Sequence, residues 1–128
     1  MPITPALAAV GIALLLGALG LFQLALAAGA PLGRFAWGGG HRVLPRALRI
    51  GSLVSILIYA LLTLVMLDRA GLVLWLPDEI AVPLAWAVAG YFGLGIGLNL
   101  ASRSLPERAV MSPLAALLCA LSVIVALG

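Results

Sequence analysis

The chain has 128 residues, of which 65% are hydrophobic and only 9% are charged, and its mean hydropathy is +1.28. A soluble domain of this size cannot carry so few charges, and the length leaves no room for a separate soluble catalytic module. The net charge of +3 comes from seven arginines, and in so apolar a chain this excess first indicates topology rather than a nucleic-acid partner.

Four apolar stretches, each about twenty residues long, follow one another along the chain. A helix of that length, rising about 1.5 Å per residue, crosses a hydrocarbon core of about 30 Å. We therefore expect an all-α polytopic membrane protein, an antiparallel bundle of four transmembrane helices in which residues 1–128 form a single transmembrane domain. The expected spans are residues 4–28, 47–67, 80–101 and 105–127.

Local signals agree with these spans in chain order. No Arg or Lys precedes the first span, and its apolar run exceeds the roughly 7 to 15 residues of a signal-peptide core, so we expect it to stay in the protein. The third span follows Asp78 and Glu79, whose carboxylates favour the positive end of a helix dipole. The fourth opens with Ser104 and, three residues later, Glu107, which is the spacing of a capping box.

The arginines predict the orientation of the bundle. Six of the seven lie in or beside the first and third connections, whereas the second carries only Arg69 next to acidic residues. Lys and Arg accumulate in short loops on the cytoplasmic side of a membrane. We therefore expect residues 29–46 and 102–108 to be cytoplasmic loops of a multi-pass protein in the inner cell membrane, with both termini outside.

Small residues repeat every four positions in the third span. Lipid gives apolar side chains little reason to prefer one another, so close helix packing in a membrane depends on small residues. The repeat predicts a packing stripe, used either within the chain or, alternatively, between copies in a homo-oligomer. The stripe consists of Ala85, Ala89, Gly93, Gly97 and Ala101.

Polar side chains in the spans gather near the expected cytoplasmic ends. Gln23 and Asn99 lie near the ends of the first and third spans, while Ser52, Ser55 and Ser112 lie near the starts of the second and fourth. We expect an inward-facing polar pocket between the helices; the alternative is that the amides bond across helices and the serines bond their own backbone. None of these residues is ionisable, which argues against a proton-coupled transporter.

The first connection combines a tryptophan, three consecutive glycines, the single histidine and several arginines. Its arginines and those of the third connection should meet at the cytoplasmic face, where they need anionic partners. Phospholipid head groups supply such charge generically, and a specific phosphate- or carboxylate-bearing ligand is the alternative. The candidate ligand-binding residues are Gln23, Trp37, His41, Arg42, Arg46, Ser52, Ser55, Asn99, Arg103 and Arg108.

Evidence for catalysis in the sequence is weak. His41 could serve as a general base if Glu107 approached it from the other cytoplasmic loop, and these two are the candidate catalytic residues. We expect no metal, because one histidine and one cysteine, Cys119, in different halves of the bundle cannot form a site. We also expect no cofactor and no nucleic-acid partner.

Two segments carry a family resemblance. The loop from Trp37-Gly38-Gly39 to Pro45 and the turn from Asn99 to Pro106 resemble those of small four-span bacterial integral membrane proteins, over nearly the whole chain. The resemblance implies a class and a compartment but brings no activity with it. The layout is more distantly similar to other four-helix membrane families, such as the DoxX-like proteins, as an analogy of architecture.

The sequence thus favours a non-enzymatic membrane protein. Its arginine-rich cytoplasmic face and inter-helix pocket would bind an anionic lipid or small ligand, or dock a partner protein in the membrane. Two alternatives stay open. One is a homo-oligomeric channel or small transporter, and the other is a membrane enzyme that acts on a lipid-like substrate with His41.

Overall fold

The computed structural model describes residues 3–128 and confirms the all-α class, since this range contains four long helices, two short 3-10 turns and no strand. Each long helix is long and apolar enough to cross a membrane, so the chain is a small multi-pass membrane protein whose surroundings are a lipid bilayer. The helices are α1 (Pro5–Ala27), α2 (Arg46–Arg69), α3 (Asp78–Leu100) and α4 (Leu105–Leu127), and the turns are η1 (Gly33–Phe35) and η2 (Trp37–Gly39).

The helix ends lie within two residues of the predicted spans, and the differences have a simple cause. α2 continues through Asp68 and Arg69, and α3 already begins at Asp78. These residues are charged, so hydropathy leaves them out, yet charged residues continue a helix readily at the water boundary. Hydropathy therefore marks the hydrocarbon core rather than the helix.

Two helix starts are capped by side chains. Thr4 accepts a hydrogen bond from the Leu7 backbone N–H at 3.2 Å, and Ser104 accepts one from the Glu107 N–H at 3.5 Å. The predicted capping box is only half formed, because the Ser104 N–H donates to the Ser102 hydroxyl at 3.1 Å. The Glu107 carboxylate is thus not used on its own helix end.

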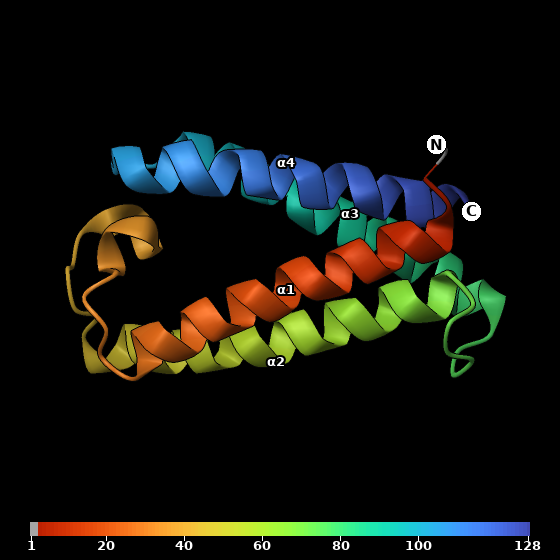
Figure 1. Ribbon diagram of the computed structural model, residues 1–128, viewed down its shortest axis with the longest axis horizontal. Coiled ribbons are helices and arrows are strands. Elements are labelled where there is room, and N and C mark those ends of the chain that lie inside the picture. The colour runs from red at the N-terminus through yellow and green to blue at the C-terminus, as the bar shows by residue number, and fades with distance from the viewer. Residues whose placement is uncertain (1–2) are drawn as a thin grey trace.

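The four helices form two antiparallel hairpins, α1 with α2 and α3 with α4 (Figure 1). Each helix packs most extensively on its hairpin partner, and α1 with α4 and α2 with α3 form the lesser contacts. The hairpins converge at the end that holds both chain termini and diverge at the other end, where the connection between α1 and α2 lies between them.

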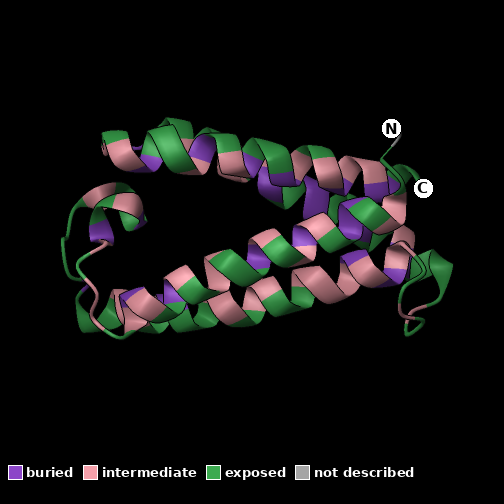
Figure 2. Ribbon diagram, viewed as in Figure 1, coloured by how far each residue is buried: buried purple, intermediate pink, exposed green. Residues whose placement is uncertain are grey.

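The core occupies the converging end (Figure 2). Alanines such as Ala8, Ala85 and Ala126 are almost fully buried there, and their small side chains let the helix backbones approach closely. Larger residues fill the remaining space. The main buried cluster is Ala8, Ala9, Ile12, Leu16, Met66, Ala85, Val88, Phe92, Leu118, Val125 and Ala126.

Asp68 orders the loop at this end. Its buried carboxylate accepts hydrogen bonds from the backbone N–H groups of Trp75 and Leu76 at 2.7 and 2.8 Å. The Arg69 guanidinium donates to the Ala126 carbonyl at 3.1 Å, which ties the end of α2 to the end of α4. These bonds hold the two hairpins together where they converge.

The predicted small-residue stripe on α3 is divided by the structure. Ala85 and Ala89 are buried, and the Cys119 thiol donates to the Ala89 carbonyl at 3.5 Å, but Gly97 and Ala101 are exposed. A helix turns once in 3.6 residues, so each four-residue step drifts by about 40° around the axis. The far end of the stripe therefore leaves the interface with α4, and its use between copies stays a prediction.

Replacing Leu16 by Ala tests the converging core. Leu16 is 2% exposed and Leu14, on the same helix, is 70% exposed. We expect Leu16→Ala to lower the free energy of unfolding by about 2 to 5 kcal/mol, and Leu14→Ala to change it by less than about 0.5 kcal/mol. Equilibrium unfolding in mixed detergent micelles measures both, and equal losses would contradict this packing.

Candidate functional site

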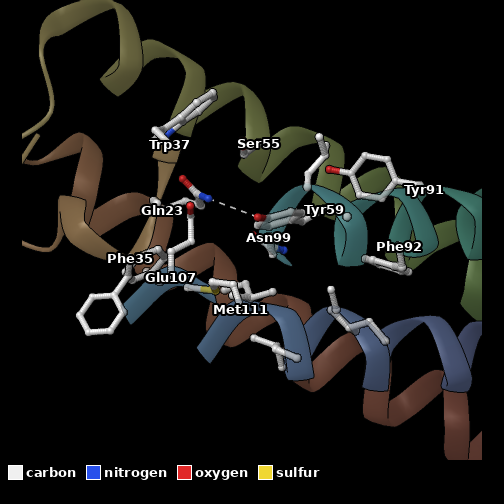
Figure 3. Close-up of a pocket in the computed structure, with 18 of the residues that line it drawn as sticks. Gln23, Phe35, Trp37, Ser55, Tyr59, Tyr91, Phe92, Asn99, Glu107 and Met111 are labelled. Atoms are coloured by element: carbon white, nitrogen blue, oxygen red, sulfur yellow. Dashed lines mark hydrogen bonds between the residues drawn. The ribbon is translucent and has the colours of Figure 1, made fainter. Parts of the chain in front are cut away.

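A cavity of about 290 Å³ lies between the two hairpins, in the half of the bundle where they diverge (Figure 3). All four helices and the connection between α1 and α2 contribute to its wall. It is lined by Leu19, Phe22, Gln23, Phe35, Ala36, Trp37, Ser55, Tyr59, Tyr91, Phe92, Leu94, Gly95, Leu98, Asn99, Glu107, Met111, Leu114, Ala115 and Leu118.

Aromatic side chains are concentrated in this wall. Only 6% of the chain is aromatic, yet all three phenylalanines, both tyrosines and one of the three tryptophans line the cavity. Their rings are large and rigid, so they hold the diverging helices apart while covering the space between them with apolar and π surface. The Tyr91 and Phe92 rings pack edge to face, with centroids 5.5 Å apart.

A small polar group faces the same space. The Gln23 amide donates to the Tyr59 hydroxyl at 3.2 Å, which joins α1 to α2. Gln23 is only 8% exposed, and its carbonyl oxygen has no hydrogen-bond partner in the described part of the chain. Figure 3 shows Gln23, Asn99 and Glu107 near one another at this end of the cavity. An unpartnered buried acceptor is costly, so a bound donor would stabilise it.

Glu107 is the one charged residue among those that line the cavity. It is 7% exposed and lies in the first turn of α4, where the helix dipole favours a negative charge. Its carboxylate accepts one long hydrogen bond, 3.4 Å, from the Gly38 backbone N–H. Because that bond is long and single, the carboxylate keeps most of its capacity to accept further bonds.

The connection between α1 and α2, residues 28–45, covers the wide end of the cavity, and we call it the closing loop. Several hydrogen bonds hold it. The Trp37 indole donates to the Ser52 hydroxyl at 3.2 Å, and the Ser104 hydroxyl donates to the Arg34 carbonyl. The Gly38 backbone N–H donates to the Glu107 carboxylate, and the Arg49 guanidinium donates to the Leu44 carbonyl at 2.8 Å. The loop is therefore attached to both hairpins and closes the wedge between them.

Glycine is required at two points of this attachment. Gly39 has a φ of +74°, and a side chain on it would strike Ser104. Gly51 has room only for hydrogen, since a Cβ there would lie 2.8 Å from the Trp37 ring. Gly39 thus lets the closing loop lie against the start of α4, and Gly51 leaves room for the Trp37 indole on α2.

The structure brings some of the sequence-predicted site residues together and separates others. Gln23, Trp37, Ser55 and Asn99 line the cavity, together with Glu107. Ser52 and Ser112 are buried outside its wall, and Ser52 holds the Trp37 indole. The Ser55 hydroxyl donates to the Gly51 carbonyl at 3.0 Å, as the backbone-bonding alternative predicts. The remaining predicted site residues are exposed and lie outside the cavity wall. They are His41, Arg42, Arg46, Arg103 and Arg108.

Sequence reasoning missed the aromatic wall. Neither the two tyrosines, Tyr59 and Tyr91, nor the three phenylalanines, Phe22, Phe35 and Phe92, are among the predicted site residues. No common position in the spans marks them, because Phe22 lies near the end of α1, Phe35 lies in the first connection, and the other three lie near the middles of their helices. A hydropathy scale scores these residues without regard to their position in the fold, so it does not show that their rings cluster.

The candidate catalytic pair is not supported by a contact. His41 is exposed, and within residues 3–128 no hydrogen bond is recorded between it and Glu107, whose carboxylate faces the cavity. The same residues contain no group of three His, Cys, Asp or Glu side chains that could hold a metal ion.

No protein-family model, no curated protein and no solved structure matches the chain. The resemblance to small four-span bacterial membrane proteins therefore gains no support from these comparisons. The fold and the cavity define the class at a coarser level, as a small four-helix membrane protein with an aromatic-lined cavity between its hairpins.

Replacing Gly51 by Ala tests the contact between the Trp37 indole of the closing loop and α2. The added methyl group would displace the Trp37 indole from Ser52, so we expect acrylamide to quench Trp37 fluorescence more strongly. The measurement uses a background with Trp75→Phe and Trp86→Phe. Gly90→Ala is the control, since a Cβ there meets nothing within 4 Å; equal quenching in both variants would refute the described contact.

Proposed function

We propose that this protein binds one small amphiphilic molecule in the cavity between its hairpins and that it does so without catalysing a reaction. The observation that carries this proposal is the composition of the cavity wall. Apolar and aromatic side chains form most of it, and Gln23, Asn99 and Glu107 gather at one end. Such a distribution matches a ligand with an apolar body and a single polar group.

The arginines have a separate role in this proposal. Arg42, Arg46, Arg103 and Arg108 are exposed outside the cavity wall, so we assign them to anionic phospholipid head groups rather than to the ligand in the cavity. Their position at one end of the bundle favours a cytoplasmic closing loop, with both termini outside. The compartment we propose is the inner membrane of a bacterial cell.

A catalytic role is less well supported by the wall of the cavity. The Ser55 hydroxyl is bonded to its own helix, and the histidine that would act as a base lies on the exposed surface. The cavity wall therefore offers no second group that could act as the base while Glu107 acts as the acid, or the reverse. Binding needs only the shape and polarity that the wall provides.

Filling the cavity should abolish ligand retention. Gly95 lines the cavity, whereas Gly97, two residues further on the same helix, is exposed, outside the wall, and has open space around it. We expect Gly95→Phe to lose the small molecule that the unaltered protein retains, and Gly97→Phe to keep it. Native mass spectrometry from mild detergent reports the bound mass in each case. Equal retention by both variants, or no retained molecule in the unaltered protein, would overturn the proposed cavity site.

Single cysteines test the orientation. In a Cys119→Ala background, His41→Cys places a thiol on the closing loop and Leu74→Cys places one on the loop between α2 and α3, where Leu74 is exposed. We expect a membrane-impermeant maleimide added to intact cells to label the Leu74→Cys protein, and to label the His41→Cys protein only after permeabilisation. Labelling in the opposite order would reverse the topology.

A further inference from the structure

We infer that the molecule taken up by the cavity is an organic cation, an ammonium-type group on an apolar or aromatic body, with Glu107 as its counter-ion. This inference rests on the proposed function, because it specifies the ligand class of the same cavity. It differs from the sequence-based expectation of an anionic ligand, which depended on arginines that the structure places outside the cavity wall.

The first argument is the state of the Glu107 carboxylate. It is almost fully buried, and in residues 3–128 its recorded interaction is the single hydrogen bond from the Gly38 N–H. Burying a carboxylate without a charged partner costs free energy. A cation in the cavity would offset this penalty at the place where the carboxylate already points.

Three arginines lie near Glu107 in sequence or in the loop that is bonded to the start of its helix. None of them pairs with its carboxylate in residues 3–128. The Arg108 guanidinium donates to the Ser102 carbonyl at 3.4 Å. The Arg34 guanidinium lies 5.0 Å from the centroid of the Phe35 ring, a cation–π contact. Arg103 is exposed at the turn before α4 and does not line the cavity. The carboxylate is thus open to a cation from outside the chain.

The rest of the wall fits a positive charge as well. Aromatic faces attract cations, most strongly when water is excluded, and Trp37, Tyr59 and Tyr91 belong to this wall. The unpartnered Gln23 oxygen adds a second acceptor to the wall of the cavity. An anion in the same place would meet a like charge and no charged donor, which makes it the poorer ligand.

Helix capping does not account for the direction of the Glu107 side chain. In a complete capping box the carboxylate would turn back to the Ser104 N–H, but Ser102 occupies that donor. The helix dipole stabilises the carboxylate in either direction, because both lie within the first turn. The turn toward the cavity is therefore not explained by the helix end alone.

The experiment compares two probes of the same shape. Benzyltrimethylammonium has a positively charged nitrogen at the position where neopentylbenzene has a neutral carbon. Binding of each is measured to the whole chain in nanodiscs of zwitterionic lipid, with empty nanodiscs of the same lipid as baseline. The variants are Glu107→Gln and, as a matched control, Glu79→Gln, which removes an exposed carboxylate near the opposite end of the bundle.

We expect the cation to bind the unaltered protein and the Glu79→Gln variant, and to bind Glu107→Gln at least about tenfold more weakly, since contacts with a buried charge are worth that much or more. We expect Glu107→Gln to retain neopentylbenzene, which shows that its cavity is intact. Equal cation affinity in all three proteins, or an equal loss in both variants, would overturn the cation inference.

Two failures can be told apart. If neopentylbenzene binds, Gly95→Phe abolishes that binding, and the cation binds no better than the neutral probe, the cavity site stands and the charge assignment is wrong. If Gly95→Phe and Gly97→Phe leave the binding of both probes unchanged, the cavity is not the binding site, and the proposed function fails together with this inference.

Discussion

Unequal side-chain size along the helices is the constraint on which the structure depends. At the end with the termini, buried alanines such as Ala8 and Ala85 let the backbones approach closely, and Asp68 and Arg69 tie the adjoining loop and helix ends together. Toward the other end, six aromatic residues line the cavity between the hairpins. Because lipid does not drive apolar helices together, packing volume decides their spacing, and the bundle becomes a wedge with a cavity in its wide half.

The closing loop and Glu107 form one arrangement at that wide end. The loop reaches both hairpins, through Ser52 on one side and through Ser104 and Glu107 on the other. Its glycines allow the approach, and the half-formed capping box leaves the carboxylate facing inward. A single acidic side chain therefore both fastens the cover of the cavity and supplies its charge.

Much of the fold follows from the sequence, and less of the site does. Hydropathy places all four helices within two residues of their ends because each span must match the hydrocarbon thickness. The stripe through Gly97 leaves the α4 interface beyond its first half because four-residue spacing drifts around a helix. The direction of the Glu107 side chain was not predictable, since the capping box favours the opposite turn and only the packed loop decides between them.

The depth of the cavity has a consequence for access. Its wall takes in the second half of α1 and α3 and the first half of α2 and α4, with Tyr59 and Leu118 just past the midpoints, so it reaches from the closing loop to about the middle of the bundle. In the proposed orientation it is level with the inner leaflet alone. Amphiphiles already inserted in that leaflet lie at the right height to enter by lateral diffusion, whereas those in the outer leaflet would first have to flip. The protein would thus sample the composition of one monolayer.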